Sequence, residues 1–204
     1  MEFKSTPEEA AEHLLLIRQT IERSQRHSTL SGLSGIAAGT IVIASSVLTE
    51  TYVGNPSLPG HQTAFVILWL TTLILVAVSD FVITKLRANK VGKTLMSGIG
   101  YSWLRAVTPG LTMGLIVSIL YIQDPETYGG NIYGLWMLSY AMSVLAIGQL
   151  SAHSVSVLGW CFLAMSAFTL IGPVGWLEPR GLLAISFGGF HIVYGLIRGL
   201  RDGW

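Results

Sequence analysis

Residues 62–84 read QTAFVILWLTTLILVAVSDFVIT and contain a single charged side chain, Asp80. The basic segment KLRANK follows directly at residues 85–90. A helix rises about 1.5 Å per residue, so a run of this length is long enough to cross the ~30 Å hydrocarbon core of a bilayer. The stretch therefore predicts a transmembrane helix that ends at a basic, water-facing boundary.

Similar apolar runs precede and follow this stretch, and only 11% of the chain is charged, while 51% is hydrophobic. Soluble domains usually carry about 25% charged residues. We expect an all-α fold, a polytopic membrane helical bundle of about six transmembrane helices. The expected spans are Leu30–Thr49, Gln62–Thr84, Leu104–Tyr121, Ile132–Leu150, Ser154–Gly172 and Gly181–Ile197.

The third span is the least regular, because Thr108-Pro109-Gly110 interrupts it. Proline has no backbone N–H and is favoured in the first turn of a helix. This sequence would therefore start a helix rather than continue one. We expect residues 96–107 to form an interfacial or re-entrant segment instead.

Residues 1–29 predict an amphipathic helix in the cytoplasm, before the membrane domain at 30–199 and a short tail at 200–204. Thr6, Pro7 and Glu9 form a capping box with proline in the first turn. Apolar residues then recur at helical spacing among charged ones. Such a helix packs on the membrane domain or binds a partner, and the sequence leaves both alternatives open.

Lys and Arg residues gather in alternate connections. They occur before span one, between spans two and three, and in the tail, whereas 50–61 and 122–131 have none and 173–180 has only Arg180. Basic residues are retained on the cytoplasmic side of membranes. The pattern predicts that the N-terminus and the C-terminus both lie in the cytoplasm.

Gly32, Gly35 and Gly39 in the first span form a Gly-x-x-x-Gly face. Small residues at this spacing allow the backbone of another helix to approach closely. We expect a helix-packing face here, either within the chain or between two copies of it.

Asp80 in span two and His191 in span six are the notable ionisable groups inside the predicted spans. Each is costly in hydrocarbon unless it is paired or faces water. Both are expected at a similar depth, toward the cytoplasmic side, so together they form a possible intramembrane polar site for protons or ions. The alternative is structural: His191 bonds a Ser, Thr or Asp on a neighbouring helix, and Asp80 reaches Lys85, Arg87 or Arg105.

Gly188 and Gly195 flank His191 on one helical face and leave space for a planar ring. A haem- or chlorophyll-like cofactor on His191 is therefore a further hypothesis. No second histidine is expected at the same depth, but Met142 and Cys161 are candidate partners.

Several classes of function have no support in the sequence. The net charge of +1 gives no basic surplus for nucleic acid. No catalytic motif and no metal-ligand cluster occurs, so we expect a protein that is not an enzyme. We expect its partners to be the lipid bilayer and other membrane proteins or a second copy.

Two short segments carry a resemblance: IRQTIERS at 17–24, followed by a glycine-rich span, and GGFHIVYG at 188–195. With these, the chain resembles small bacterial six-span membrane proteins whose activity is uncharacterised. The resemblance implies a bacterial inner-membrane protein and assigns no activity or site.

Taken together, these features favour an accessory, scaffold or regulatory subunit that acts through helix–helix contacts. A small-solute or proton carrier that uses Asp80 and His191 is the first alternative. A redox or pigment subunit with its cofactor on His191 is the second.

Overall fold

The computed structural model describes residues 12–16, 31–56, 58, 60–171 without 91–97, and 179–202. All regular structure in these ranges is helical, which confirms the all-α bundle. The labelled elements are α2 (Gly32–Leu48), η1 (Thr49–Val53), α3 (His61–Lys90), α4 (Gly98–Gln123), α5 (Pro125–Tyr128), α6 (Ile132–Gly148), α7 (His153–Ile171), α8 (Pro179–Leu183), η2 (Ala184–Gly189) and α9 (Phe190–Asp202).

Five helical stretches are long and apolar enough to cross a membrane: Gly32–Val53, His61–Arg87, Tyr101–Gln123, His153–Ile171 and Gly181–Arg201. The sixth apolar helix, α6, is shorter at 17 residues and extends about 26 Å. The two π-helical segments, η1 and η2, continue the first and last of these stretches. The helices are compatible with a multi-pass integral membrane protein.

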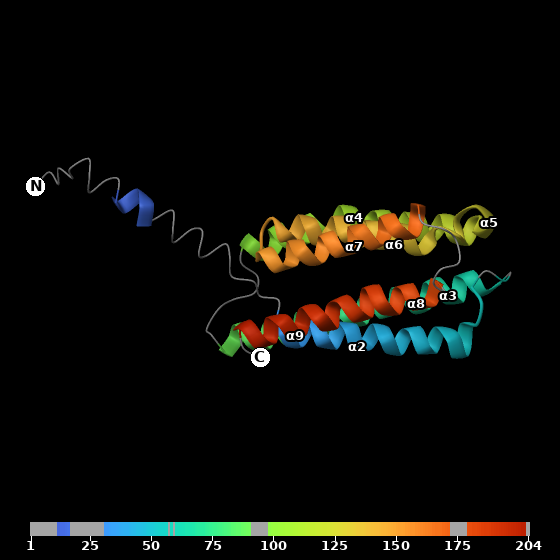
Figure 1. The fold of residues 1–204 in the computed structure, drawn as a ribbon, viewed down its shortest axis with the longest axis horizontal. Coiled ribbons are helices and arrows are strands. Elements are labelled where there is room, and N and C mark those ends of the chain that lie inside the picture. The colour runs from blue at the N-terminus through green and yellow to red at the C-terminus, as the bar shows by residue number, and fades with distance from the viewer. Residues whose placement is uncertain are drawn as a thin grey trace, which may run out of the picture.

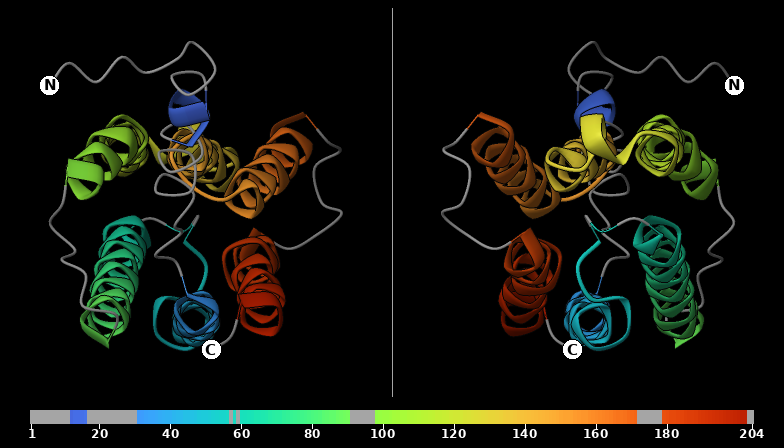
Figure 2. Two further views of the ribbon diagram at one scale, coloured as in Figure 1. Left: turned by 90° about the vertical axis from the view of Figure 1, so that its left-hand side faces the viewer. Right: turned by 90° about the vertical axis from the view of Figure 1, so that its right-hand side faces the viewer.

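The long helices form two layers of three, seen edge-on in Figure 1 and end-on in Figure 2. One layer contains α4, α6 and α7, with α6 packed against both neighbours. The other contains α3, α2 and α9, with α2 in the middle. The first and last long helices are therefore neighbours.

Successive long helices run in opposite directions, and most of the charged residues lie near the two ends of the bundle. The end of α3 and the end of α9 carry basic side chains, including Lys85, Arg87 and Arg201. The opposite end carries Glu50, Asp124 and Glu126. Hydrogen bonds from Thr127 hold the pKa of the exposed Asp124 carboxyl below its usual value, so it stays negatively charged to a lower pH than an ordinary aspartate.

The expected interruption of the third span is wrong. The helix α4 runs from Gly98 through Pro109 to Gln123 without a break. Pro109 removes one helix hydrogen bond, but hydroxyl groups bond the carbonyls nearby: Thr108 donates to Leu104 (2.7 Å) and Ser143 of α6 donates to Val107 (3.2 Å). Neither carbonyl is that of Arg105, which Pro109 leaves without its N–H partner, so these bonds support the turn before the proline rather than replace the lost bond.

Large aromatic side chains fill much of the space between the two layers. Phe65 of α3 stacks on Trp136 of α6, with ring centroids 5.4 Å apart and planes 3° apart. Trp136 also donates from Nε1 to the Ser118 hydroxyl at 3.0 Å. Tyr121 of α4 is fully buried and donates to the carbonyl of Pro56 at 2.7 Å. These contacts join the layers near the acidic end.

Only part of the expected N-terminal helix lies in the described ranges. Residues 12–16 are helical and exposed, whereas Thr6, Pro7 and Glu9 lie outside the described residues. At the other end, α9 continues to Asp202, so helix extends into the segment expected to be a tail.

Within the layer of α2, glycine residues bring the backbone of α2 into contact with that of η2 and α9. A Cβ on Gly32 would lie 2.5 Å from the carbonyl oxygen of Gly195, and one on Gly39 would lie 2.5 Å from that of Gly188. Such distances exclude a side chain without movement of backbone. We call this contact the glycine seam, formed by Gly32, Gly35 and Gly39 of α2 and Gly188, Gly195 and Gly199 of η2 and α9.

We expect Gly195→Ala to destabilise the fold. The new Cβ would meet the carbonyl oxygen of Gly32 at 2.5 Å and the nitrogen of Ile36 at 2.6 Å. Overpacking of this kind costs about 1–3 kcal/mol, which exceeds the ~1 kcal/mol that alanine contributes to a helix over glycine. Thermal denaturation in detergent, followed by size-exclusion chromatography, measures the change.

Gly189→Ala is the matched control, because no atom lies within 4 Å of its added Cβ. The midpoint temperature of thermal denaturation of Gly189→Ala should equal or exceed that of the native chain. Equal midpoints for the two variants would show that the glycine seam is not tightly packed.

Candidate functional site around His191

The glycine seam sets the position of His191. A Cβ on Gly35 would lie 2.9 Å from the backbone oxygen of His191, so this residue is held directly against α2. The π-helical turn η2 ends two residues before His191, and such turns often mark functional sites. The imidazole is only 9% exposed and reaches Tyr140 on α6 in the other layer.

Both ring nitrogens of His191 are engaged. Nδ1 lies 2.7 Å from the carbonyl oxygen of Phe187, and Nε2 lies 2.7 Å from the hydroxyl of Tyr140. A carbonyl only accepts, so Nδ1 carries the proton. In a neutral imidazole Nε2 then accepts, and the Tyr140 hydroxyl is its donor. The two hydrogen bonds therefore select one tautomer and join the two layers.

Aromatic rings surround this hydrogen bond. Phe162 of α7 is fully buried, with its centroid 5.5 Å from that of His191 and 4.7 Å from that of Tyr140. Phe187 and Phe190 also pack against Phe162. A polar pair in apolar surroundings is costly unless its hydrogen bonds are made. Both hydrogen bonds of His191 are made, so the Tyr140–His191 pair connects α6 with α9.

Asp80 lies near the same pair, but on α3. Its carboxyl lies close to Ser34 on α2, whose hydroxyl donates to the carbonyl of Ser31 at 3.0 Å, and it interacts electrostatically with Tyr140. Within the described residues no hydrogen bond joins Asp80 to His191 directly. Tyr140 bonds His191 and feels the charge of Asp80, and Ser34 is the polar side chain close to the carboxyl.

Tyr140 is not among the residues that the sequence pointed to. The expected partner of His191 was a Ser, Thr or Asp, and tyrosines were expected chiefly at the membrane interface. The available signal was position, because Tyr140 lies in the middle of an apolar run. A tyrosine hydroxyl buried in that way usually has a hydrogen-bond partner.

The glycines beside His191 do not leave an open patch. The added Cβ of Gly188 would meet Ile43 of α2 at 2.7 Å, and that of Gly195 would meet Gly32. A planar ring on His191 would also have to displace the hydroxyl of Tyr140. The geometry therefore lends no support to a haem- or chlorophyll-like cofactor, which stays a prediction.

The other expected cofactor ligands lie elsewhere. Met142 is 58% exposed on α6, and Cys161 is exposed on α7. Among the described residues, no group of three or more His, Cys, Asp or Glu side chains could hold a metal ion. The cluster of His191, Tyr140 and Asp80 is thus the candidate site, with hydrogen bonding and proton transfer as its available chemistry.

We expect Tyr140→Phe to lower the free energy of unfolding by about 1–3 kcal/mol, because Nε2 of His191 becomes a buried acceptor without a donor. The ring and its aromatic contacts remain. Unfolding in mixed detergent micelles measures the loss. Tyr52→Phe removes a hydroxyl from a side chain that is 79% exposed and should change stability by less than about 0.5 kcal/mol. Equal effects of the two substitutions would contradict the role given to this hydrogen bond.

Comparison with protein-family models, with curated proteins and with solved structures finds no match for this chain. Its function is therefore argued from its own geometry.

Proposed function

We propose that this chain is a non-enzymatic integral membrane protein that acts as an accessory, scaffold or regulatory subunit through helix–helix contacts. The observation that carries the proposal is the engagement of its intramembrane polar groups with one another. His191 bonds Tyr140 and Phe187, and the Asp80 carboxyl lies close to Ser34 of α2. Groups used in this way hold helices together, which is the requirement of a structural subunit.

We place the protein in a bacterial inner membrane with both termini in the cytoplasm. The separation of charge between the two ends of the bundle supports this orientation, because basic residues remain on the cytoplasmic side. The end that carries Lys85, Arg87 and Arg201 is then cytoplasmic.

The helix α3 is the surface through which such a subunit would contact a partner. Only 11% of its most apolar stretch is buried, compared with 44% for the first span, because α3 lies at the edge of its layer and packs chiefly against α2. Its outer face carries large exposed side chains at helical spacing: Ile67, Ile74, Val78, Phe81 and Val82. This apolar stripe fits an apolar membrane helix of another protein.

A photoreactive amino acid at Ile74 should crosslink a second protein in native membranes. Trp160 on α7 is the control position, because it is 62% exposed, on an edge helix of the opposite layer. We expect a discrete protein adduct from Ile74 and only lipid adducts from Trp160, separated by mass spectrometry. The proposal fails if Ile74 also yields only lipid adducts and the chain purifies in mild detergent without a second protein.

A proton carrier is the second candidate, and it is favoured because Tyr140 bonds His191 and interacts electrostatically with Asp80. If His191 gains a proton, Nε2 becomes a donor and Tyr140 must accept. The O–H of Tyr140 then turns away from the imidazole, and the Asp80 carboxylate is the nearby charge that attracts it. Protonation of His191 thereby changes the electrostatic environment of Asp80.

Proteoliposomes that contain a pH-sensitive dye test this candidate. A carrier should move protons faster than empty liposomes do under an imposed potential, and Asp80→Asn and Tyr140→Phe should each abolish most of that flux. Asp124→Asn, at an exposed helix cap, should leave it unchanged. Flux equal to that of empty liposomes, or flux unaffected by both substitutions, would remove this candidate.

A further inference from the structure

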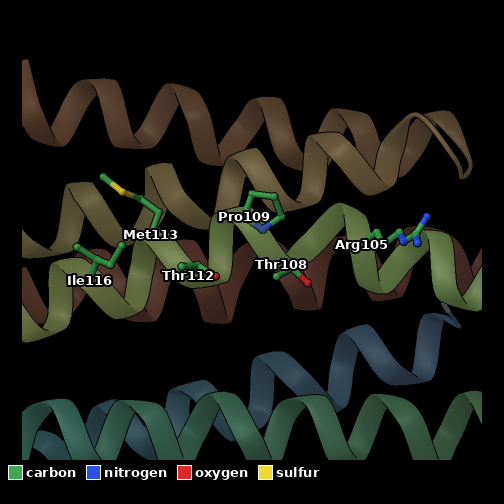
Figure 3. A pocket seen from close by; sticks show the side chains of 6 residues that line it. All are labelled: Arg105, Thr108, Pro109, Thr112, Met113 and Ile116. Carbon is green, nitrogen blue, oxygen red and sulfur yellow. The ribbon is translucent and has the colours of Figure 1, made fainter.

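A shallow, open depression of about 490 Å³ lies along one face of α4, outside the site around His191. Its lining comes from this single helix, at intervals of three and four residues, as Figure 3 shows: Arg105, Thr108, Pro109, Thr112, Met113 and Ile116. All six side chains are exposed. The depression, which we call the α4 groove, is therefore open toward the surroundings of the bundle.

The α4 groove changes in polarity along its length. Arg105 lies nearest the basic end of the bundle, the hydroxyls of Thr108 and Thr112 follow, and Met113 and Ile116 form the far part. The distance from residue 105 to residue 116 is about 16 Å at 1.5 Å per residue. One leaflet of hydrocarbon is about 15 Å thick, half of the ~30 Å core. The length of the groove therefore matches the thickness of one leaflet.

The charge of Arg105 indicates which kind of molecule the α4 groove can bind. Arg105 is a cation in a groove that is otherwise uncharged, and it shares its end of the bundle with Lys85, Arg87 and Arg201. The acidic side chains Glu50, Asp124 and Glu126 lie at the far end. An amphiphile in this groove would therefore place a negative group at Arg105 and a hydrocarbon chain beside Met113 and Ile116.

We propose that the α4 groove binds an anionic phospholipid of the leaflet at the basic end of the bundle. The phosphate of the headgroup bonds the guanidinium of Arg105. One acyl chain lies along Thr112, Met113 and Ile116, over a length that matches a single leaflet. The inference is independent of the proposed function, because it uses none of the residues around His191 and none of the apolar stripe of α3.

Native mass spectrometry of the full chain, released from mild detergent, tests the proposal with two lipids that differ only in headgroup. Dioleoyl phosphatidylglycerol should be retained in preference to dioleoyl phosphatidylcholine. In Arg105→Gln the retention of phosphatidylglycerol should fall about fivefold, which corresponds to the loss of one basic residue at a membrane surface. Arg201→Gln removes an exposed arginine at the same end but outside the groove, so it should leave retention unchanged.

Thr112→Trp supplies a second test that leaves Arg105 in place. The indole should occupy the middle of the groove and lower phosphatidylglycerol retention by excluding the acyl chain. Equal retention of the two lipids by the native chain would overturn the proposal, as would an equal loss in Arg201→Gln and Arg105→Gln. Because the comparison of lipids uses the native chain, a variant that fails to fold does not remove the test.

Discussion

The contact between the backbones of α2 and α9 is the constraint on which the other arrangements depend. Along the glycine seam the two helices are so close that a single methyl group on Gly32 or Gly195 would meet backbone atoms at 2.5 Å. Hydrophobic burial gives little drive to association within a bilayer, so close packing of this kind has to provide it. The seam joins the first and last long helices, so α2 lies in the middle of its layer, between α3 and α9.

The seam also fixes the residue that connects this layer to the other. His191 is held against α2 through its backbone, and its imidazole reaches Tyr140 across the bundle. The two interfaces therefore differ in chemistry. Glycine lets helices approach within the layer of α2, whereas aromatic rings, Phe162 among them, fill the wider space between layers. The Tyr140–His191 hydrogen bond lies among those rings, where an unmade bond would be costly.

The helices could be predicted because hydropathy is a local property. The bounds of α3 and α7 lie within a few residues of the expected spans, apart from the basic extension of α3 to Lys90. Two errors had physical causes outside the local sequence. Pro109 stays within α4, where hydroxyl groups, one of them on α6, support the preceding turn through the carbonyls of Leu104 and Val107. Tyr140 was missed because a single sequence does not say which helix faces His191, and six helices can be arranged in many ways.

The central claim is that His191 is a closed, neutral group held by Phe187 and Tyr140. Solid-state ¹⁵N spectroscopy of the histidine-labelled chain in lipid bilayers, with His191→Gln as the variant that assigns the signal, tests it directly. We predict a neutral imidazole with the proton on Nδ1 and an accepting Nε2, and a shift of the Nε2 signal in Tyr140→Phe. An imidazolium at neutral pH, a proton on Nε2, or a signal unaffected by Tyr140→Phe would contradict the account.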